Sequence, residues 1–337
     1  MRRPFSVSVG RSASRSPILA GARAAAVLAV AAAFGLALAP AVAAAAKPPK
    51  QETFATPDAA VQALVKAAST ADQKALAAIF GPEREKLLSG DPVEDANALK
   101  GFAERLAKAA TVEKVDEAKY TLLVGEERWP SPIPIVKAGK KWRFDTEAGL
   151  DEILNRRVGR NELSAIMTCR AYVVAQWEYF TEARDTSTDA IAVYAQHFIS
   201  KPGRHDGLYW DVPEGGKPSP LGSLVAEARE EGYTPGAAKP PDQPHHTPYH
   251  GYFFRILKAQ GPHAPGGRFS YVINGNMIAG YGLIAFPAKW GASGVMTFIV
   301  NNQGRVYEKN LGAQTEELAR AVTEYDPDPS WRLVDEP

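Results

Sequence analysis

The stretch RRVGRNELSAIMTCRAYVVAQWEYFTEAR, residues 156–184, decides how the fold of this chain is read. Its apolar positions recur at helical spacing, and Asn161 is of a residue type that often caps the start of a helix. We therefore predict a long helix that begins after Asn161. The positions that its spacing assigns to one long face are Leu163, Ile166, Met167, Arg170, Ala171, Val174, Gln176, Trp177 and Phe180.

A tight cluster of basic residues precedes this helix, with Arg156, Arg157 and Arg160 placed around Gly159. Such a cluster can bind an anionic ligand, so Arg156 and Arg160 are candidate ligand-binding residues. The alternative is that the arginines pair with the acidic residues of the segment 147–152 or cap the helix that this segment begins.

The segment ahead of the cluster predicts a small α+β domain. Thr56 followed by Pro57 is typical of a helix N-terminus, and two helices then extend to Gly81-Pro82. A third helix is expected from about Asp95 to Ala110. Three short runs with strand character follow, which are YTLLVG (120–125), PIPIVKAG (132–139) and KWRFDTE (141–147).

Residues 52–151 therefore present helices first and antiparallel strands afterwards. In this order of elements the segment resembles the small cone-shaped α+β domains similar to nuclear transport factor 2. The resemblance implies a fold with a pocket and no particular chemistry.

The segment that follows the long helix predicts an antiparallel sheet. DAIAVYAQHFIS (189–200) is expected to form a second helix ending near Gly203. A connection rich in proline and glycine extends from Pro213 to Pro248, with one short helix near Leu221 to Glu230. Four runs with strand character, separated by glycine turns, then make up the sheet: GYFFRILKAQ (251–260), RFSYVING (268–275), NMIAGYGLIAFPAKW (276–290) and GVMTFIVNNQGRVYEKN (294–310).

A long helix packed across a small antiparallel sheet resembles the globular heads of type IV pilin-like and pseudopilin proteins. We therefore expect an α+β fold with three parts: a signal peptide at 1–46, an N-terminal α+β domain at 47–155 and a pilin-like α+β domain at 156–337. No prepilin-type leader precedes Asn161, so assembly into a pilus is not implied.

The first segment of the chain is typical of a secretory signal peptide. Arginines precede an apolar run from about Ala24 to Leu38, and small residues suited to cleavage lie near Ala46. The alternative is a membrane anchor, which Gly35 and Pro40 within the apolar run disfavour. We expect a soluble periplasmic or secreted protein without a membrane span after cleavage.

Composition limits the classes of partner and the sources of stability. The net charge of the whole chain is +1, and the arginine-rich first segment accounts for the basic excess. No clustered basic surface is implied, which argues against nucleic acid as a partner. The single cysteine, Cys169, allows no intramolecular disulfide, so stability comes from a packed core.

Over about four fifths of its length the chain resembles an uncharacterised family of exported bacterial proteins, the domain of unknown function 2950. The segments that carry the resemblance are RRVGRNEL (156–163), GRHDGLYW (203–210), SPLGSLVAEA (219–228), PYHGYFFRILKAQG (248–261), GVMTFIVNNQGRVYEKNLG (294–312) and the terminal YDPDPSW (325–331). The resemblance implies no activity.

The histidines are few, and three of the six lie close together at His245, His246 and His250. Their spacing could supply zinc ligands, but Pro244 and Pro248 prevent the helix that would align the imidazoles. The alternative, which we favour, is that His250 marks the entry to a strand. We predict no metal and no cofactor, and His250 stays a candidate ligand-binding residue.

Catalytic constellations are equally sparse. Cys169 lies inside the predicted helix, where a buried thiol is inert, and no G-x-S-x-G motif occurs. Acidic residues that could pair for glycoside cleavage are scattered among loops and one strand; these are Asp206, Asp211, Glu214 and Glu308. We therefore assign no catalytic residue.

The loop GRHDGLYW is the best candidate for recognition, because it combines the polar His205 and Asp206 with the aromatic Tyr209 and Trp210. The alternative is that its aromatic residues fasten the loop to the sheet. The function we expect is a non-enzymatic binding or assembly module of the cell envelope with an envelope protein as a possible partner. An envelope hydrolase is the alternative, with Arg160 and His250 joining the loop in a cleft between the two domains.

Overall fold

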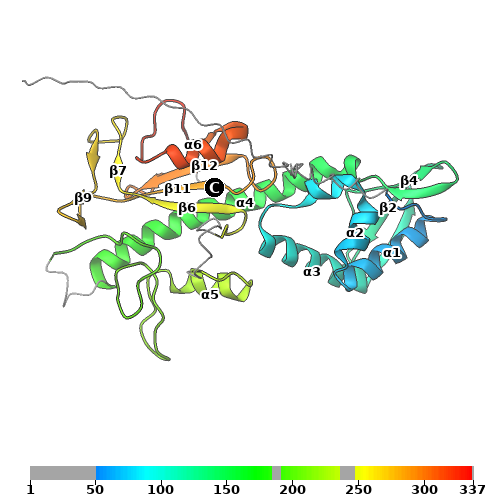
Figure 1. Cartoon of the computed structure of the whole chain (residues 1–337), viewed down its shortest axis with the longest axis horizontal. Helices are drawn as coiled ribbons and strands as arrows, with labels where there is room; N and C mark the ends of the chain where they lie inside the picture. Colours follow the sequence, from blue (N-terminus) through cyan, green and yellow to red (C-terminus); the bar gives the residue numbers. More distant parts are fainter. Residues whose placement is uncertain (1–50, 184–190, 236–246, 336–337) are drawn as a thin grey trace, which may run out of the picture. The chain divides into compact units, whose positions relative to one another are not determined.

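A computed structural model describes residues 51–183, 191–235 and 247–335 of the chain (Figure 1). The predicted signal peptide lies outside these ranges, as do His245 and His246. The described residues cluster as one compact unit. The fold is α+β with antiparallel sheets, as the sequence predicts. None of the helices in the described ranges combines the length and apolar composition needed to span a membrane.

Three capped helices come first along the described chain. They are α1 (Pro57–Ser69), α2 (Gln73–Phe80) and α3 (Pro92–Lys108), with the 3-10 helix η1 (Pro82–Leu87) between the last two. The side chains of Thr56, Asp72 and Asp91 each accept a hydrogen bond from a main-chain N–H of the first turn. The predicted cap at Thr56 is thus confirmed, while α3 begins three residues earlier than expected.

The helices pack on an antiparallel sheet in the order β1-β2-β4-β5, with β3 paired to β2. Its strands are β1 (Ala110–Lys114), β2 (Lys119–Val124), β3 (Trp129–Pro130), β4 (Ile135–Ala138) and β5 (Lys141–Phe144). A hairpin joins β4 to β5, since Ala138 pairs with Lys141. Buried side chains of α1, α2 and the sheet form the first hydrophobic core, with Leu64, Ile79, Leu122 and Phe144 among the most deeply buried.

A single 33-residue helix, α4 (Thr146–Glu178), then extends from this core to the next, and a short π-helical turn, η2 (Tyr179–Ala183), follows it. The prediction that Asn161 caps the start of a helix is wrong, because Asn161 lies in the interior of α4. The boundary predicted between residues 155 and 156 also falls inside this helix.

Only part of the predicted face of α4 is buried: Gln176 is fully buried and Ile166 packs against the core. Leu163, Met167, Val174 and Trp177 are all exposed, with 60% or more of each residue accessible. The other buried positions of this part of α4 are small or aromatic side chains that the prediction left out, which are Ala165, Cys169, Tyr172 and Ala175. These side chains pack on β11 and β12 of the second sheet.

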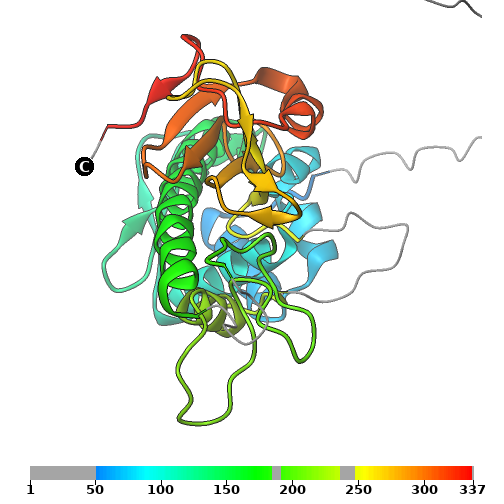
Figure 2. The ribbon, with the colours of Figure 1, turned by 90° about the vertical axis from the view of Figure 1, so that its left-hand side faces the viewer.

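The second sheet is antiparallel, with the order β14-β13-β12-β11-β6. Its strands are β6 (Tyr252–Leu257), β11 (Gly282–Pro287), β12 (Met296–Asn301), β13 (Tyr307–Asn310) and β14 (Arg332–Leu333). Helix α4 covers one face, and α6 (Thr315–Ala321), preceded by the 3-10 helix η3 (Gly312–Gln314), covers the other (Figure 1 and Figure 2). Each face therefore has its own hydrophobic core.

Two predicted elements of this region differ from the structure. The described part of DAIAVYAQHFIS, residues 191–200, is irregular and not helical, because Gln176 of α4 holds its main chain by two hydrogen bonds to Ala195. The run RFSYVING belongs to two small ladders outside the main sheet. These pair β7 (Ala259–Gln260) with β8 (Phe269–Ser270), and β9 (Val272–Ile273) with β10 (Asn276–Met277). The predicted short helix is confirmed as α5 (Gly222–Glu230).

Candidate functional site

A cavity of about 580 Å³ lies on the α4 side of the second sheet. Segments far apart in the sequence form its walls: Thr168 and Tyr172 of α4, residues 196–199, Leu221 and the buried side of α5, residues 233–235 and 247–249, and Phe254, Ile256 and Lys258 at the β6 edge of the sheet. A cavity of this size suits a small organic ligand.

The alternation of side chains along β6 explains why this strand forms one wall. Phe254 and Ile256 pack with the core on the α4 face, whereas Phe253 and Leu257 pack with the core on the α6 face. Lys258, two positions beyond Ile256, follows the same alternation, and it lines the cavity with an exposed side chain. The strand thus presents an apolar surface that ends in a cation.

Polar side chains occupy part of the cavity wall. The Lys258 Nζ donates a hydrogen bond to Gln196 Oε1 at 3.1 Å, and within the described ranges it forms no ion pair. His197 lines the same wall and is exposed. Tyr172 donates to the Gly282 carbonyl at 3.2 Å and accepts from Gln176 Nε2 at 3.0 Å, and its burial raises its pKa.

Arg255 is among the residues that line the cavity, but its guanidinium is held on the opposite face of the sheet. Its Nη2 donates to the main-chain carbonyls of Ala319 at 2.8 Å and Val322 at 2.6 Å, at the end of α6 on the opposite face. This guanidinium caps a helix C-terminus and is not a ligand for the cavity.

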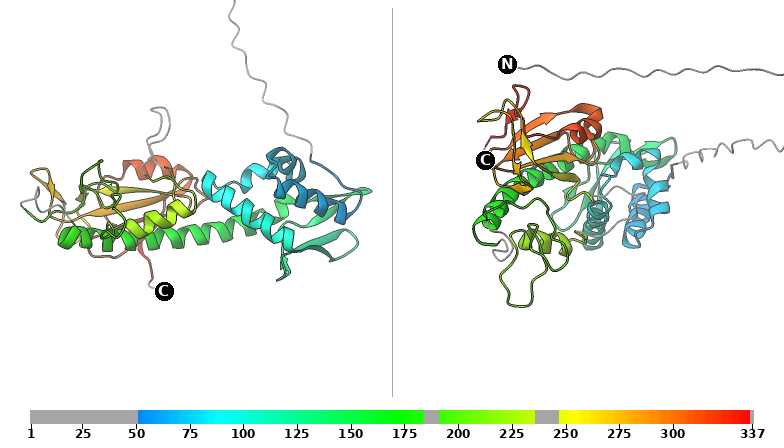
Figure 3. Two further views of the ribbon diagram at one scale, coloured as in Figure 1. Left: turned by 90° about the horizontal axis from the view of Figure 1, so that it is seen from below. Right: turned by 60° about the vertical axis from the view of Figure 1, so that its left-hand side comes forward.

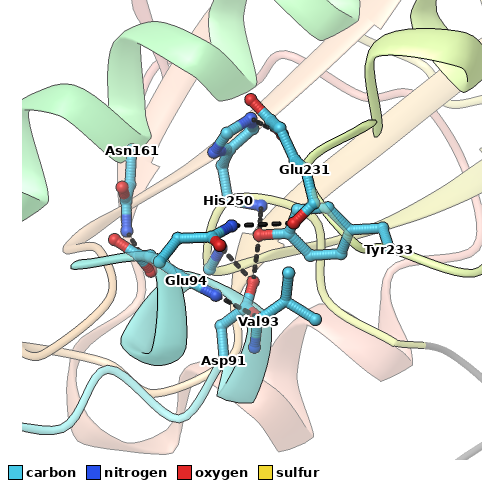
Figure 4. Close-up of polar contacts among 9 residues, drawn as sticks. Asp91, Val93, Glu94, Asn161, Glu231, Tyr233 and His250 are labelled. Atoms are coloured by element: carbon cyan, nitrogen blue, oxygen red, sulfur yellow. Dashed lines mark hydrogen bonds and ion pairs between the residues drawn. The ribbon is translucent and has the colours of Figure 1, made fainter. Parts of the chain in front are cut away.

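A buried polar cluster lies beside the cavity and joins α3 to the start of β6 (Figure 4). The fully buried carboxylate of Asp91 is its centre. One oxygen accepts the N–H groups of Val93 at 3.0 Å and Glu94 at 3.2 Å, as an N-cap does. The other accepts the Tyr233 hydroxyl at 2.9 Å and the Gly251 N–H at 3.0 Å. Burial beside the Asp91 carboxylate raises the pKa of Tyr233.

Glu94, Asn161 and Arg157 extend this cluster to α4. The Asn161 amide donates to Glu94 Oε2 at 3.2 Å and to the Ser293 carbonyl at 3.0 Å. Burial raises the pKa of Glu94 and lowers that of Arg157. The guanidinium donates to the Leu87 carbonyl through Nη2, while its buried Nη1 has no hydrogen-bond partner in the described part of the chain. The contacts of Asp91, Glu94 and Asn161 are those of a structural junction.

His250 belongs to a two-residue turn at the entry to β6. His250 and Gly251 both have positive φ values, +46° and +72°, and the flanking Tyr249 and Tyr252 exchange main-chain hydrogen bonds. The expectation that His250 marks the entry to a strand is confirmed. Its Nε2 lies 3.1 Å from Glu231 Oε2, so its side chain contacts the end of α5 (Figure 4).

The GRHDGLYW loop is closed by its own contacts. Asp206 Oδ1 accepts the Lys201 N–H at 2.9 Å, and the His205 ring stacks on Trp210 at 4.2 Å between centroids. The Tyr209 hydroxyl donates to Asp211 Oδ1 at 2.5 Å, and Arg229 of α5 lies over its ring. These contacts favour the interpretation that the aromatic residues fasten the loop.

The three arginines of the basic cluster lie within α4 and have different surroundings. Arg156 pairs with Glu152 at 2.6 Å and lies over the Trp129 ring, as the pairing alternative predicts. Arg157 is buried, and Arg160 is exposed. The described contacts thus join neither Arg156 nor Arg160 to the loop that holds His205 or to His250.

The cavity was missed by sequence reasoning, and its wall contains none of the candidate residues named above. One signal was available: the alternation Phe254, Ile256, Lys258 places a lysine at the end of an apolar strand face. In the described ranges, no three histidine, cysteine, aspartate or glutamate side chains gather as metal ligands would.

The chain was compared with protein families, curated proteins and solved structures. No curated protein and no solved structure matches it. A family profile, described as a protein of unknown function (DUF2950), matches residues 51–334, which include both sheets, α4 and the whole described cavity wall. The chain therefore belongs to the DUF2950 family of proteins of unknown function.

Proposed function

We propose that this protein is an exported, non-enzymatic binding module of the cell envelope whose cavity holds an amphipathic ligand. The apolar part of the ligand lies against Phe254, Ile256 and Leu224, and its anionic group lies at Lys258. The observation that carries the proposal is the cavity of about 580 Å³, since ligand pockets are mostly apolar with a few placed polar groups.

The chemistry of the wall favours binding over catalysis. Covalent and acid–base catalysis need a nucleophile and a base that are hydrogen-bonded to each other. Tyr172 uses its hydroxyl for contacts with Gly282 and Gln176, and Lys258 contacts an uncharged amide. The hydrolase alternative gains no support from His205, Asp206 and His250, whose contacts belong to two separate local networks.

Two further parts of the proposal rest on the sequence. The arginine-rich start and apolar run before Ala46 support export to the periplasm or the medium. In the order of the elements that the sequence predicts, residues 52–151 resemble nuclear transport factor 2 cone folds, and residues 156–337 resemble pilin-like heads. Both likenesses support a scaffold for binding, with an envelope protein as a possible partner.

A variant that fills the cavity with a larger side chain tests the proposal directly. Leu224→Trp on α5 adds an indole at the cavity wall, and Ala226→Trp on the same helix adds one at an exposed position away from it. We expect anilinonaphthalene sulfonate, an apolar sulfonate, to bind the wild type and the Ala226→Trp variant saturably. Binding to the Leu224→Trp variant is expected to weaken about tenfold or more, because the occupied volume is lost. Equal binding by both variants, at equal thermal stability, contradicts the proposal.

The position of the charged group has its own test. Lys258→Met removes the cation and keeps an apolar stem, so binding of dodecanoate is expected to weaken about fivefold while binding of dodecanol is unchanged. Isothermal titration of both ligands measures the difference. An equal loss for the two ligands would contradict the place of the anionic group at Lys258.

A further inference from the structure

An apolar stripe covers the exposed side of α4. It consists of Leu163, Met167, Val174 and Trp177, which are 62%, 68%, 66% and 60% exposed. Their spacings of four, seven and three residues, with Arg170 filling the long interval, follow the alternation of four and three that defines the seam of a coiled coil. We call these four residues the α4 stripe.

The α4 stripe cannot be explained as part of the core. The opposite side of the helix already packs on the second sheet (Figure 3). Ala165, Cys169 and Tyr172 belong to the core on that side. Single exposed apolar residues are ordinary, but a continuous stripe on one face marks an interaction surface. From Leu163 to Trp177 the stripe is about 21 Å long at 1.5 Å per residue, a length suited to a partner helix.

The charges beside the stripe indicate what the partner is. Arg160 and Glu178 are 18 residues apart, which is five turns of an α-helix, so they point in the same direction along one flank. Their midpoint, position 169, lies one residue from the middle of the stripe at position 170. In the described ranges neither side chain forms an ion pair. A helix with these charges is complementary to an antiparallel copy of itself.

We infer that the α4 stripe binds a second copy of this chain, with the two α4 helices antiparallel about a two-fold axis near residue 169. Arg160 then lies opposite the partner's Glu178, and the symmetry repeats the pair. Leu163 packs against the partner's Val174, and Met167 lies at the centre. The inference uses neither the cavity nor its ligand, so it stands apart from the proposed function.

Arg170 opposes this pairing and provides a sharp test. It is half-buried within the line of the stripe, and close to the axis it approaches its own symmetry mate. Like charges in such a seam weaken association. Replacing Arg170 by leucine removes the repulsion and adds apolar surface, so the two copies should associate more tightly.

Sedimentation velocity of protein expressed from the full chain, over a concentration series, tests the inference. Wild type is expected to dimerise reversibly, and Met167→Glu is expected to be monomeric. Arg160→Glu and Glu178→Arg are each expected to raise the dimer dissociation constant about tenfold, since each breaks both symmetric pairs. Arg170→Leu is expected to lower it about tenfold.

The charge-reversed double variant, Arg160→Glu with Glu178→Arg, is the decisive arm. It restores both ion pairs with opposite polarity, so its dissociation constant should return to within about threefold of wild type. Glu104→Arg on α3 controls for net charge. A protein that stays monomeric at about 0.5 mM, far above the concentrations at which specific dimers form, overturns the inference. A dimer that the double variant does not restore overturns the antiparallel pairing.

Discussion

Gly251 is the residue at which three elements meet. It follows His250 in the turn before β6, its N–H donates to Asp91, and its φ is +72°. A Cβ there would lie 2.7 Å from the Asn161 Nδ2 and 2.8 Å from the Ser293 Cβ. The position therefore requires glycine for its backbone conformation and also for space.

Two glycine-to-alanine variants separate these requirements. Gly275 occupies the corresponding place in the turn between β9 and β10, with φ +82° and no atom within 4 Å of a Cβ. Gly275→Ala is expected to cost about 1–2 kcal/mol of unfolding free energy from backbone strain alone. Gly251→Ala is expected to cost roughly a further 1–3 kcal/mol, because Asn161 and Ser293 have to move. Urea denaturation measures both, and equal losses would show that space is not limiting.

Glu94 gives the stability of the protein a pH dependence. Burial raises the pKa of its carboxyl above the ordinary 4.5, despite the opposing effects of the Asn161 hydrogen bond and the Arg157 charge. The folded state thus binds the proton more tightly than the unfolded state does. This contribution to stability is fully present below pH 4.5 and is lost as the pH rises through the raised pKa.

Glu94→Gln should therefore stabilise the protein at pH 7, because it removes the buried charge and keeps an oxygen that accepts from Asn161. The fall in stability of the wild type as the pH rises above 4.5 should become shallower in the variant. Urea unfolding across this range is the measurement. Glu104→Gln on α3, at an exposed position, shows the effect of the same change without burial. A Glu94→Gln variant less stable than wild type at pH 7 would contradict the expected direction of the effect.

At the scale of elements, α4 shows what periodicity can and cannot predict. Helical spacing correctly predicts a helix around residues 161–180. It does not identify the buried face, because Leu163, Met167, Val174 and Trp177 are exposed while the face on the sheet uses Tyr172 and the small residues Ala165, Cys169 and Ala175. Small residues let the helix lie close to β11 and β12. This close packing decides which face is buried, although the other face has more large apolar residues.

Gly159 tests whether α4 is continuous where the sequence predicted a break. The position is helical and exposed, and nothing lies within 4 Å of a Cβ built there. Gly159→Ala should therefore stabilise the protein by about 0.5–1 kcal/mol, as in any helix interior. Gly149→Ala in the same helix should destabilise it, since its Cβ would lie 2.7 Å from the Pro132 main chain. Thermal unfolding of both variants checks the contrast, and a destabilising Gly159→Ala would argue for a break.

Local patterns predicted more of the fold than of the candidate site. The cap at Thr56 and the strand entry at His250 depend on neighbouring residues, and both are confirmed. The helix expected at 189–200 failed because Gln176, far away in the sequence, holds Ala195. The cavity could not be predicted for the same reason, since its walls come from segments between positions 168 and 283.

At the scale of the whole described unit, the hydrophobic cores belong to two separate sheets, and α4 and the Asp91 cluster connect them. Asp91 caps α3 beside the first sheet. Its carboxylate also accepts hydrogen bonds from Tyr233 and Gly251 beside the second sheet. Its loss should therefore affect both regions.

Asp91→Ala should lower the unfolding free energy by about 3–5 kcal/mol, because it removes a cap and leaves the Tyr233 hydroxyl and the Gly251 N–H buried without an acceptor. Asp72 is the matched control, since its exposed side chain caps α2 through Lys74 and Ala75 only. Asp72→Ala should cost about 1 kcal/mol. Hydrogen exchange of Asp91→Ala should accelerate both in the first turn of α3 and at the turn before β6. Equal costs for the two variants, or faster exchange at α3 alone, would mean that Asp91 is only a helix cap and that α4 alone couples the two sheets.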